Sequence, residues 1–134
     1  MPVALSNLFE RAGVVSSGIS AHIVHEATHI VDIAATIYDA AGVEYPGEII
    51  GNELTPLEGH SFQQAIKNGN WVRPAPIFWE HEGNRAVRLG DWKLVSEGNT
   101  VCELYNMKAD RTELNDLSDE QPEVLARLVD MYES

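Results

Sequence analysis

The chain has 134 residues, of which 21 are acidic and 9 basic, so its formal net charge at pH 7 is −12. This length suffices for one compact domain, and a hydrophobic fraction of 44% is ordinary for a globular protein. The negative charge opposes approach to duplex nucleic acid and to anionic membrane surfaces, so neither is expected as a partner. The single cysteine, Cys102, excludes an internal disulfide and a zinc ribbon.

Neither a membrane span nor a leader peptide is expected in this segment. No apolar run approaches the roughly 20 residues that a membrane-spanning helix needs. The first residues, MPVALSNLFERAG, lack the basic start of a signal peptide.

The first third of the chain predicts a short edge strand and a helix. Residues 14–15 and 19–24 have an extended pattern, and a helix over residues 29–41 follows. Thr28 is its expected N-cap and Gly42 its expected end. Apolar residues recur every three or four positions and make a broad apolar face: Ile30, Ile33, Ala34, Ile37 and Ala41.

Residues 47–76 read as a connecting segment. They are rich in glycine and proline and show little periodicity. We expect Ile49, Ile50 and Leu54 to pin this segment to a core, and a short helix to run from Phe62 to Lys67.

The last part, residues 77–134, predicts an antiparallel sheet and a final helix. Four strand-like runs, 77–82, 85–89, 92–96 and 101–106, are separated by turns of Gly, Asn and Asp. Strand alternation directs Trp92, Leu94 and Leu104 toward a helix. That helix is expected over residues 120–133, with Asp119 as its N-cap and Pro122 in its first turn. The fold class is therefore α+β: a four-stranded antiparallel sheet covered by a C-terminal helix.

Four segments, in this order, resemble the C-terminal portion of the arylsulfatase family. They are THIVDIAATIYDAAGVEYP, NELTPLEGHSF, WEHEGNRAVRLGDWKLV and ELYNMKADRTELNDLSDEQPEVLARL. The resemblance covers roughly residues 14–134. It implies that residues 1–46 are a remnant of a large α/β domain, with an edge strand and the helix 29–41, and that residues 77–134 are the small C-terminal subdomain.

The family hydrolyses sulfate monoesters with a formylglycine nucleophile, made from Cys or Ser in a C/S-x-P-x-R motif, and with a bound calcium ion. None of this maps onto residues of this chain. Cys102 lies in Cys-Glu-Leu-Tyr, where the family usually carries a large aromatic residue, so we expect a structural, half-buried side chain. No catalytic residue and no metal ligand is therefore expected here, and no sulfate ester cleavage by this segment alone.

Four polar residues of the segment WEHEGNRAVRLGDWKLV are candidates for a non-catalytic role. Glu80, His81, Asn84 and Arg85 lie in a predicted strand and turn. They could shape the substrate cleft or its interface; alternatively, they form a salt-bridged, hydrogen-bonded turn that holds the two domains together.

Residues 25–29 spell His-Glu-Ala-Thr-His, which matches the H-E-x-x-H motif of zinc proteases. That motif requires both histidines on one helix face, whereas Thr28 is expected to begin the helix here. His22, His25 and His29 are therefore candidates for adventitious metal binding only.

Three functions stay open at this point. The chain is expected to be a C-terminal sulfatase fragment; the alternatives are a non-catalytic interaction or dimerisation module and a small zinc metalloprotease. Expected partners are a second copy or the missing N-terminal sulfatase domain, because a helix cut from its sheet exposes an apolar face. Localisation is left open, although bacterial members of the family are often periplasmic or secreted.

Overall fold

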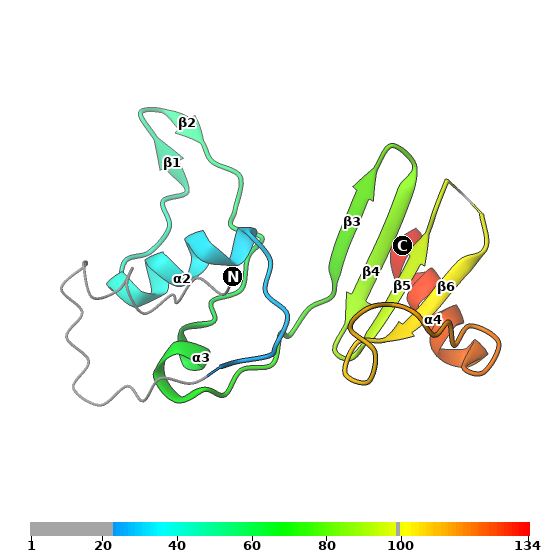
Figure 1. Ribbon diagram of the computed structural model, residues 1–134. Helices are drawn as coiled ribbons and strands as arrows, with labels where there is room; N and C mark the ends of the chain where they lie inside the picture. Colours follow the sequence, from blue (N-terminus) through cyan, green and yellow to red (C-terminus); the bar gives the residue numbers. More distant parts are fainter. Residues whose placement is uncertain (1–22, 99) are drawn as a thin grey trace. The chain divides into compact units, whose positions relative to one another are not determined.

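The computed structural model describes residues 23–98 and 100–134 (Figure 1). The chain divides between Trp71 and Val72 into two compact units, unit 1 (Met1–Trp71) and unit 2 (Val72–Ser134). Most of the predicted edge strand lies outside the described residues, and its described end at residues 23–24 has no strand structure. The assignment of residues 1–46 to a larger domain stays a prediction. In the described part of the chain, no helix has the length and apolarity needed to cross a bilayer.

Unit 1 contains helix α2 (Val31–Ala41), the strand pair β1 (Glu48–Ile49) and β2 (Asn52–Glu53), and the short helix α3 (Gln63–Asn68). Helix α2 begins two residues later than expected, and the prediction of Thr28 as its N-cap is wrong. The N-cap position is Ile30, which makes no side-chain cap hydrogen bond. Gly42, with φ 65°, ends the helix as predicted.

The β1–β2 hairpin lies inside the segment that was expected to be an irregular connection. Its two turn residues, Ile50 (φ 52°) and Gly51 (φ 78°), are both left-handed, which is the geometry of a two-residue hairpin turn. Ile50 is 95% exposed and Ile49 is also exposed, so the expectation that they pin the segment to a core is wrong. Leu54 is half-buried.

Unit 2 confirms the predicted sheet. Strands β3 (Ile77–His81), β4 (Asn84–Leu89), β5 (Trp92–Ser96) and β6 (Cys102–Asn106) form an antiparallel meander in the order β3-β4-β5-β6. Helix α4 (Pro122–Glu133) lies against one face of this sheet, and the segment between β6 and α4 crosses the other face (Figure 1). Pro122 occupies the first turn of α4 as predicted, but Gln121 stands at the N-cap position expected for Asp119.

The core of unit 2 lies between the sheet and α4. Val87, Leu94 and Leu104 are in register across β4, β5 and β6, and Leu128 from α4 covers them. All four are at most 1% exposed. Leu89 and Trp92 pack beside this cluster, so the predicted face toward the helix is confirmed.

The outer edge of β6 is capped by the segment that follows it. The Leu104 N–H donates to Asp116 Oδ1 at 2.9 Å, and the Leu117 N–H donates to the Leu104 carbonyl at 2.8 Å. Backbone groups of an edge strand that would otherwise face solvent are thereby satisfied within the chain.

A small hollow of about 60 Å³ lies between α4 and the sheet, where Cys102 is half-buried. Its lining comes from β4, β5, β6 and the end of α4: Arg85, Leu94, Cys102, Val129, Tyr132 and Glu133. The hollow lies where the resemblance described above implies a large aromatic residue. Cys102 forms part of the wall of this hollow, which is partly open to solvent.

We predict opposite effects for two substitutions of this cysteine. Cys102→Met fills the hollow with a flexible apolar side chain and is expected to raise the free energy of unfolding by about 1 kcal/mol. Cys102→Ala enlarges the hollow and is expected to lower it by about 1 kcal/mol. Urea unfolding of each variant, followed by tryptophan fluorescence, measures both values. Equal effects of the two variants would contradict the assignment.

Candidate functional site

The tip of the β3–β4 hairpin carries the four polar residues singled out in the sequence. Glu80 is paired with Arg85, and His81 with Asn84, across a turn formed by Glu82 and Gly83. Both turn residues have positive φ, 52° and 83°. Glu80 Oε1 accepts the Gly83 N–H at 3.0 Å, so this carboxylate stabilises the turn that follows it.

Asn84 and Arg85 connect the hairpin to the rest of unit 2. Asn84 Oδ1 accepts the N–H of Gly98 from the β5–β6 turn at 3.0 Å. The Arg85 guanidinium lies 5.2 Å from the centre of the Tyr132 ring and 3.9 Å from Glu133 Oε1, both at the end of α4. A cation over an aromatic face is attracted by the ring, so Arg85 helps to hold α4 on the sheet.

These contacts give three of the four candidates a role inside unit 2. Glu80, Asn84 and Arg85 each bind a neighbouring turn or helix of unit 2. His81 is exposed at the tip. A role at a cleft or at a domain interface stays a prediction for all four.

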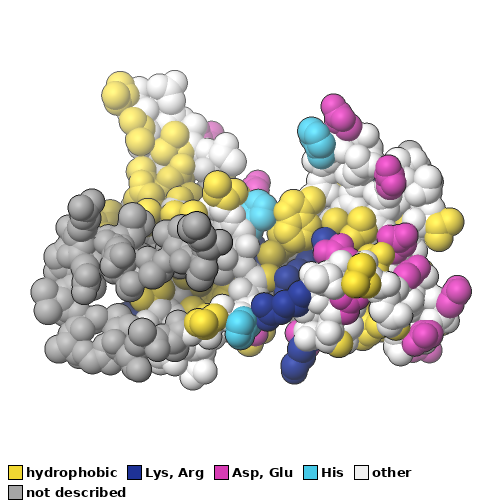
Figure 2. All heavy atoms as spheres, in the orientation of Figure 1, with side chains coloured by type: hydrophobic (Ala, Val, Ile, Leu, Met, Phe, Trp, Pro, Cys, Tyr) yellow, Lys and Arg dark blue, Asp and Glu magenta, His cyan; other side chains and the backbone are white. Residues whose placement is uncertain are grey.

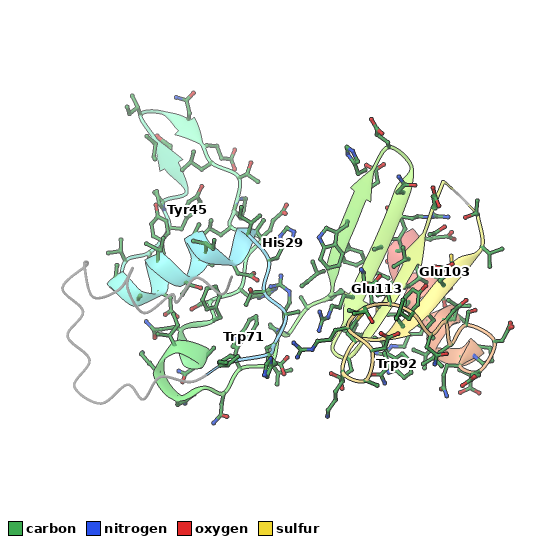
Figure 3. All side chains as sticks on the ribbon, viewed as in Figure 1. His29, Tyr45, Trp71, Trp92, Glu103 and Glu113 are labelled. Atoms are coloured by element: carbon green, nitrogen blue, oxygen red, sulfur yellow. The ribbon has the colours of Figure 1, made fainter. Side chains whose placement is uncertain are left out.

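The histidine motif has no helical geometry. His25 and His29 both precede α2, and residues 25–29 are not helical (Figure 3). The two imidazoles are therefore not presented by one helix face, as a zinc protease requires. His22 lies outside the described residues. Among residues 23–98 and 100–134, no group of three or more His, Cys, Asp or Glu side chains could hold a metal ion.

Helix α2 is bound to the rest of unit 1 through its polar side. The Asp32 carboxylate is fully buried; Oδ2 accepts the His29 N–H at 2.7 Å and Oδ1 accepts the His60 N–H at 2.8 Å. One turn later the buried Thr36 hydroxyl donates to the Asp32 carbonyl at 2.7 Å and accepts the Phe62 N–H at 3.1 Å. The Asp39 carboxylate accepts a hydrogen bond from the hydroxyl of Ser61, which lies between His60 and Phe62 in the loop.

Gly59 allows this approach. A Cβ at Gly59 would lie 2.0 Å from the Val31 carbonyl oxygen and 2.9 Å from the Asp32 Cα, which no side chain can tolerate. The glycine thus lets the backbone of residues 59–62 reach the first turn of α2, where Asp32 and Thr36 bind it.

The apolar side of α2 faces outward. Ile30, Ile33 and Ile37 are 75%, 48% and 53% exposed, and Ala34 and Ala41 are also exposed. This exposure is what the sequence predicts for a helix cut from its sheet. The hydrogen bonds of Asp32 and Thr36 hold the opposite side of the helix against the chain.

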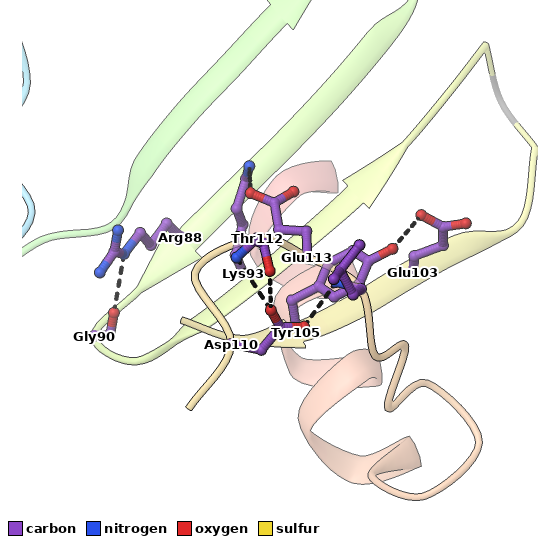
Figure 4. A network of polar contacts seen from close by, with 9 residues as sticks. Arg88, Gly90, Lys93, Glu103, Tyr105, Asp110, Thr112 and Glu113 are labelled. Carbon is purple, nitrogen blue, oxygen red and sulfur yellow. Dashed lines mark hydrogen bonds and ion pairs between the residues drawn. The ribbon is translucent and has the colours of Figure 1, made fainter. Parts of the chain in front are cut away.

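The segment between β6 and α4 is organised by two aspartates, Asp110 and Asp116. Figure 4 shows Asp110 beside Thr112. Asp110 accepts the N–H groups of Thr112, Leu114 and Asn115, at 3.1, 2.7 and 2.9 Å. These backbone hydrogen bonds, led by the one from Asn115, lower the pKa of Asp110 from 3.8 to about 2. Asp116 accepts the Leu104 N–H, and its pKa is lowered mainly for that reason.

Two more contacts join this segment to the sheet. Lys93 Nζ lies 2.6 Å from Glu113 Oε1 on the face opposite α4. The Tyr105 hydroxyl donates to Glu103 Oε2 at 2.7 Å, and this hydrogen bond is the largest cause that raises the Tyr105 pKa from 10.0 to about 12. The contacts stabilise a loop and do not assemble groups around a reaction site.

The known proteins compared below are all named as sulfatases. No family model matches the chain. The chain is 31% identical over 114 residues to an uncharacterized sulfatase of Schizosaccharomyces pombe and 35% identical over 117 residues to N-acetylglucosamine-6-O-sulfatase of Bacteroides thetaiotaomicron. Each match covers 80% of this chain, and 21% and 19% of those proteins. Human arylsulfatase K is 28% identical over 110 residues, which is 75% of this chain and 20% of that protein.

The chain is a sulfatase-family sequence. It matches the C-terminal portion of these proteins and spans about a fifth of the length of the curated relatives. The fold agrees: the crystal structure of Ps i-CgsB in complex with k-i-k-neocarrahexaose superimposes with a TM-score of 0.59 at 25% identity, over 76% of this chain and 22% of that one. A Bacteroides thetaiotaomicron structure concerned with metabolism of multiple glycosaminoglycans gives the same TM-score at 17% identity and supports the fold alone.

Sulfatase relatives imply calcium and formylglycine, and the described residues do not fit either group. They supply no cluster of metal-binding side chains. Cys102 is a half-buried residue of β6 beside α4, outside any C/S-x-P-x-R sequence. No reaction step is assigned to these residues.

Sequence reasoning missed the most buried polar residue of unit 1. An acidic residue in the first turn of a helix is favoured by the helix dipole alone, so the sequence does not show that the Asp32 carboxylate also binds the 59–62 loop. A signal was present: Asp32, Thr36 and Asp39 repeat at helical spacing and form a polar stripe opposite the isoleucines.

We predict that Asp32→Ala destabilises unit 1 by about 2 kcal/mol or more, because two part-buried backbone N–H groups lose the fully buried carboxylate that accepts them. Hydrogen exchange measured by NMR should show faster exchange of the His60 amide. Asp39→Ala, which removes an exposed contact on the same side of α2, is the matched control and should change stability by less than about 1 kcal/mol. Similar effects of the two substitutions would contradict the assigned role.

We also predict how the stability of the fold depends on pH through Asp110. The lowered pKa of Asp110 means that the folded state binds fewer protons than the unfolded state between 3.8 and about 2. Stability from this carboxylate is therefore present above pH 3.8 and lost as pH falls through about 2. Asp110→Asn should lower the melting temperature near neutral pH and flatten its acid dependence. Parallel acid profiles for wild type and variant would refute this linkage.

Proposed function

We propose that the chain serves as the non-catalytic C-terminal part of a sulfatase-type sulfuric ester hydrolase. The observation that carries the proposal is the match of about four-fifths of the chain to about one-fifth of sulfatase relatives. The organisation of unit 2 supports a structural role, because its polar candidates bind turns and α4 within the unit.

The proposed role is to complete the fold of an enzyme whose catalytic residues lie in a larger domain. Unit 2 supplies a sheet with its own buried core, and its β3–β4 hairpin ends in the exposed His81. We propose that this tip edges the substrate cleft of the complete enzyme, with Glu80, Asn84 and Arg85 fixing its position. The substrate class would be a sulfate ester, and formylglycine and calcium would be supplied by the larger body.

The alternatives have less support. A zinc metalloprotease requires a helical H-E-x-x-H segment, and residues 25–29 precede the helix. A stand-alone dimerisation module would have to associate against a net charge of −12 per copy.

Two assays test the proposal. The chain alone, with calcium and a sulfated chromogenic phenol ester, is expected to give no turnover above buffer. The N-acetylglucosamine-6-O-sulfatase relative, with its matching segment deleted, is expected to lose activity and to regain it when this chain is added in trans. The relative's own segment, added in trans, is the positive control.

Turnover by the chain alone would contradict a non-catalytic role. Restoration by the relative's own segment but not by this chain would contradict the assignment of this chain to a hydrolase of that kind.

A further inference from the structure

The tip of the β1–β2 hairpin in unit 1 has a backbone conformation that one of its residues disfavours. The two-residue turn consists of Ile50 (φ 52°) and Gly51 (φ 78°), and two positive φ angles of this kind suit Asn-Gly or Gly-Gly. A β-branched residue in the left-handed region is an outlier and carries strain. Asn52 holds the tip in this form, because its side-chain amide donates to the Ile49 and Ile50 carbonyls at 3.5 and 3.2 Å.

Within the described residues, Ile50 makes almost no contact that offsets this strain. Its side chain is 95% exposed, and the neighbouring Ile49 is 50% exposed. Figure 1 shows the hairpin extending away from α2, and Figure 2 shows hydrophobic side chains gathered along it. We call these two exposed residues, Ile49 and Ile50, the isoleucine tip.

The strands beneath the isoleucine tip bring two like charges together. Glu48 and Glu53 are directly paired across the hairpin, and both are exposed; we call them the acidic pair. Like charges opposite one another destabilise a strand pair. The hairpin thus combines a strained turn, an exposed apolar tip and two facing carboxylates. Strain that a fold retains without a gain in its own packing points to a contact with another molecule.

We propose that the isoleucine tip and the acidic pair form a docking surface for a protein whose apolar face is bordered by lysine or arginine side chains. The apolar face of such a partner removes the isoleucines from water, and its bordering cations neutralise the two carboxylates. The contact area of one hairpin tip is small, so the interaction is weak and reversible. This surface goes beyond the proposed function and does not depend on any catalytic activity of a larger domain.

Charge distinguishes this partner from other possible occupants. A second copy of the chain would bring another acidic pair toward the first, and each copy carries a net charge of −12. Sulfated glycans and anionic membrane surfaces are polyanions and meet the same repulsion. A basic, amphipathic protein surface complements both the apolar and the acidic part of the hairpin.

The test measures binding of the full chain to a fluorescently labelled helical peptide of leucine and lysine, whose leucine face is bordered by lysines, by fluorescence anisotropy. Ile49→Asn/Ile50→Asn removes two apolar side chains from the contact and should weaken binding at least about tenfold. The matched control is Val101→Asn/Leu114→Asn, which changes two residues of unit 2 that are 82% and 85% exposed. This control should bind within about twofold of wild type. Equal binding by the two double variants would overturn the docking surface.

A second pair of variants separates a specific acidic contact from general attraction between a basic peptide and an acidic chain. Glu48→Gln/Glu53→Gln should weaken binding at least about threefold and make its salt dependence shallower. Glu97→Gln/Glu120→Gln removes the same amount of charge from exposed positions of unit 2 and should bind within about twofold of wild type. Equal losses from the two pairs would mean nonspecific attraction and would overturn the proposal.

Ile50→Asn alone gives a decisive measurement if the double variants fold poorly. Asparagine suits the first position of this turn, so the variant should melt at the temperature of wild type or above it. Its binding of the peptide should nevertheless weaken about threefold or more. A purely structural role of Ile50 would instead lower the melting temperature, and that result would contradict the proposal.

Three further results would also overturn it. One is the absence of measurable peptide binding by the wild-type chain. Another is a wild-type dimer in light scattering that Ile50→Asn dissociates, because a second copy would then be the occupant. The third is displacement of the peptide by the truncated N-acetylglucosamine-6-O-sulfatase relative described above, because the larger domain would then cover the hairpin.

Discussion

The buried carboxylate of Asp32 determines which side of helix α2 is exposed in unit 1. By accepting backbone N–H groups from His29 and His60, it joins the start of α2 to a loop about 30 residues later in the chain. A carboxylate that accepts two backbone donors in a buried site is a strong and directional contact. It fixes the polar side of α2 inward, and the exposure of the isoleucines follows from that choice.

Unit 2 is organised in a different way. Its stability comes from apolar packing of α4 across three strands, with Leu128 over Val87, Leu94 and Leu104. Polar side chains secure the periphery: Asn84 joins two turns, and Arg85 contacts the end of α4. The two units therefore differ: unit 2 has a closed apolar core, whereas in unit 1 the apolar face of α2 is exposed.

The sheet of unit 2 was predictable because its turns carry Gly, Asn and Asp between alternating strands, so local chemistry and global fold agree. The β1–β2 hairpin was not, because Ile50 takes a left-handed conformation that β-branched residues rarely adopt. The periodicity of α2 identifies an apolar side and a polar side, but it does not identify the contacts that bury the polar side. Which side is buried depends on the distant residues Gly59 and His60. For the hairpin candidates, sequence identified the residues, but the partners of Asn84 and Arg85 lie in other turns and elements.

The capped edge of β6 has a consequence for how this sheet behaves when chains are crowded. With the Leu104 amide and carbonyl already bound by Asp116 and Leu117, an incoming strand from another molecule finds no regular ladder to join on that side. Growth of the sheet into an intermolecular aggregate is thereby discouraged at β6. Asp116, which binds the Leu104 amide, thus also opposes pairing of β6 with a strand of another molecule.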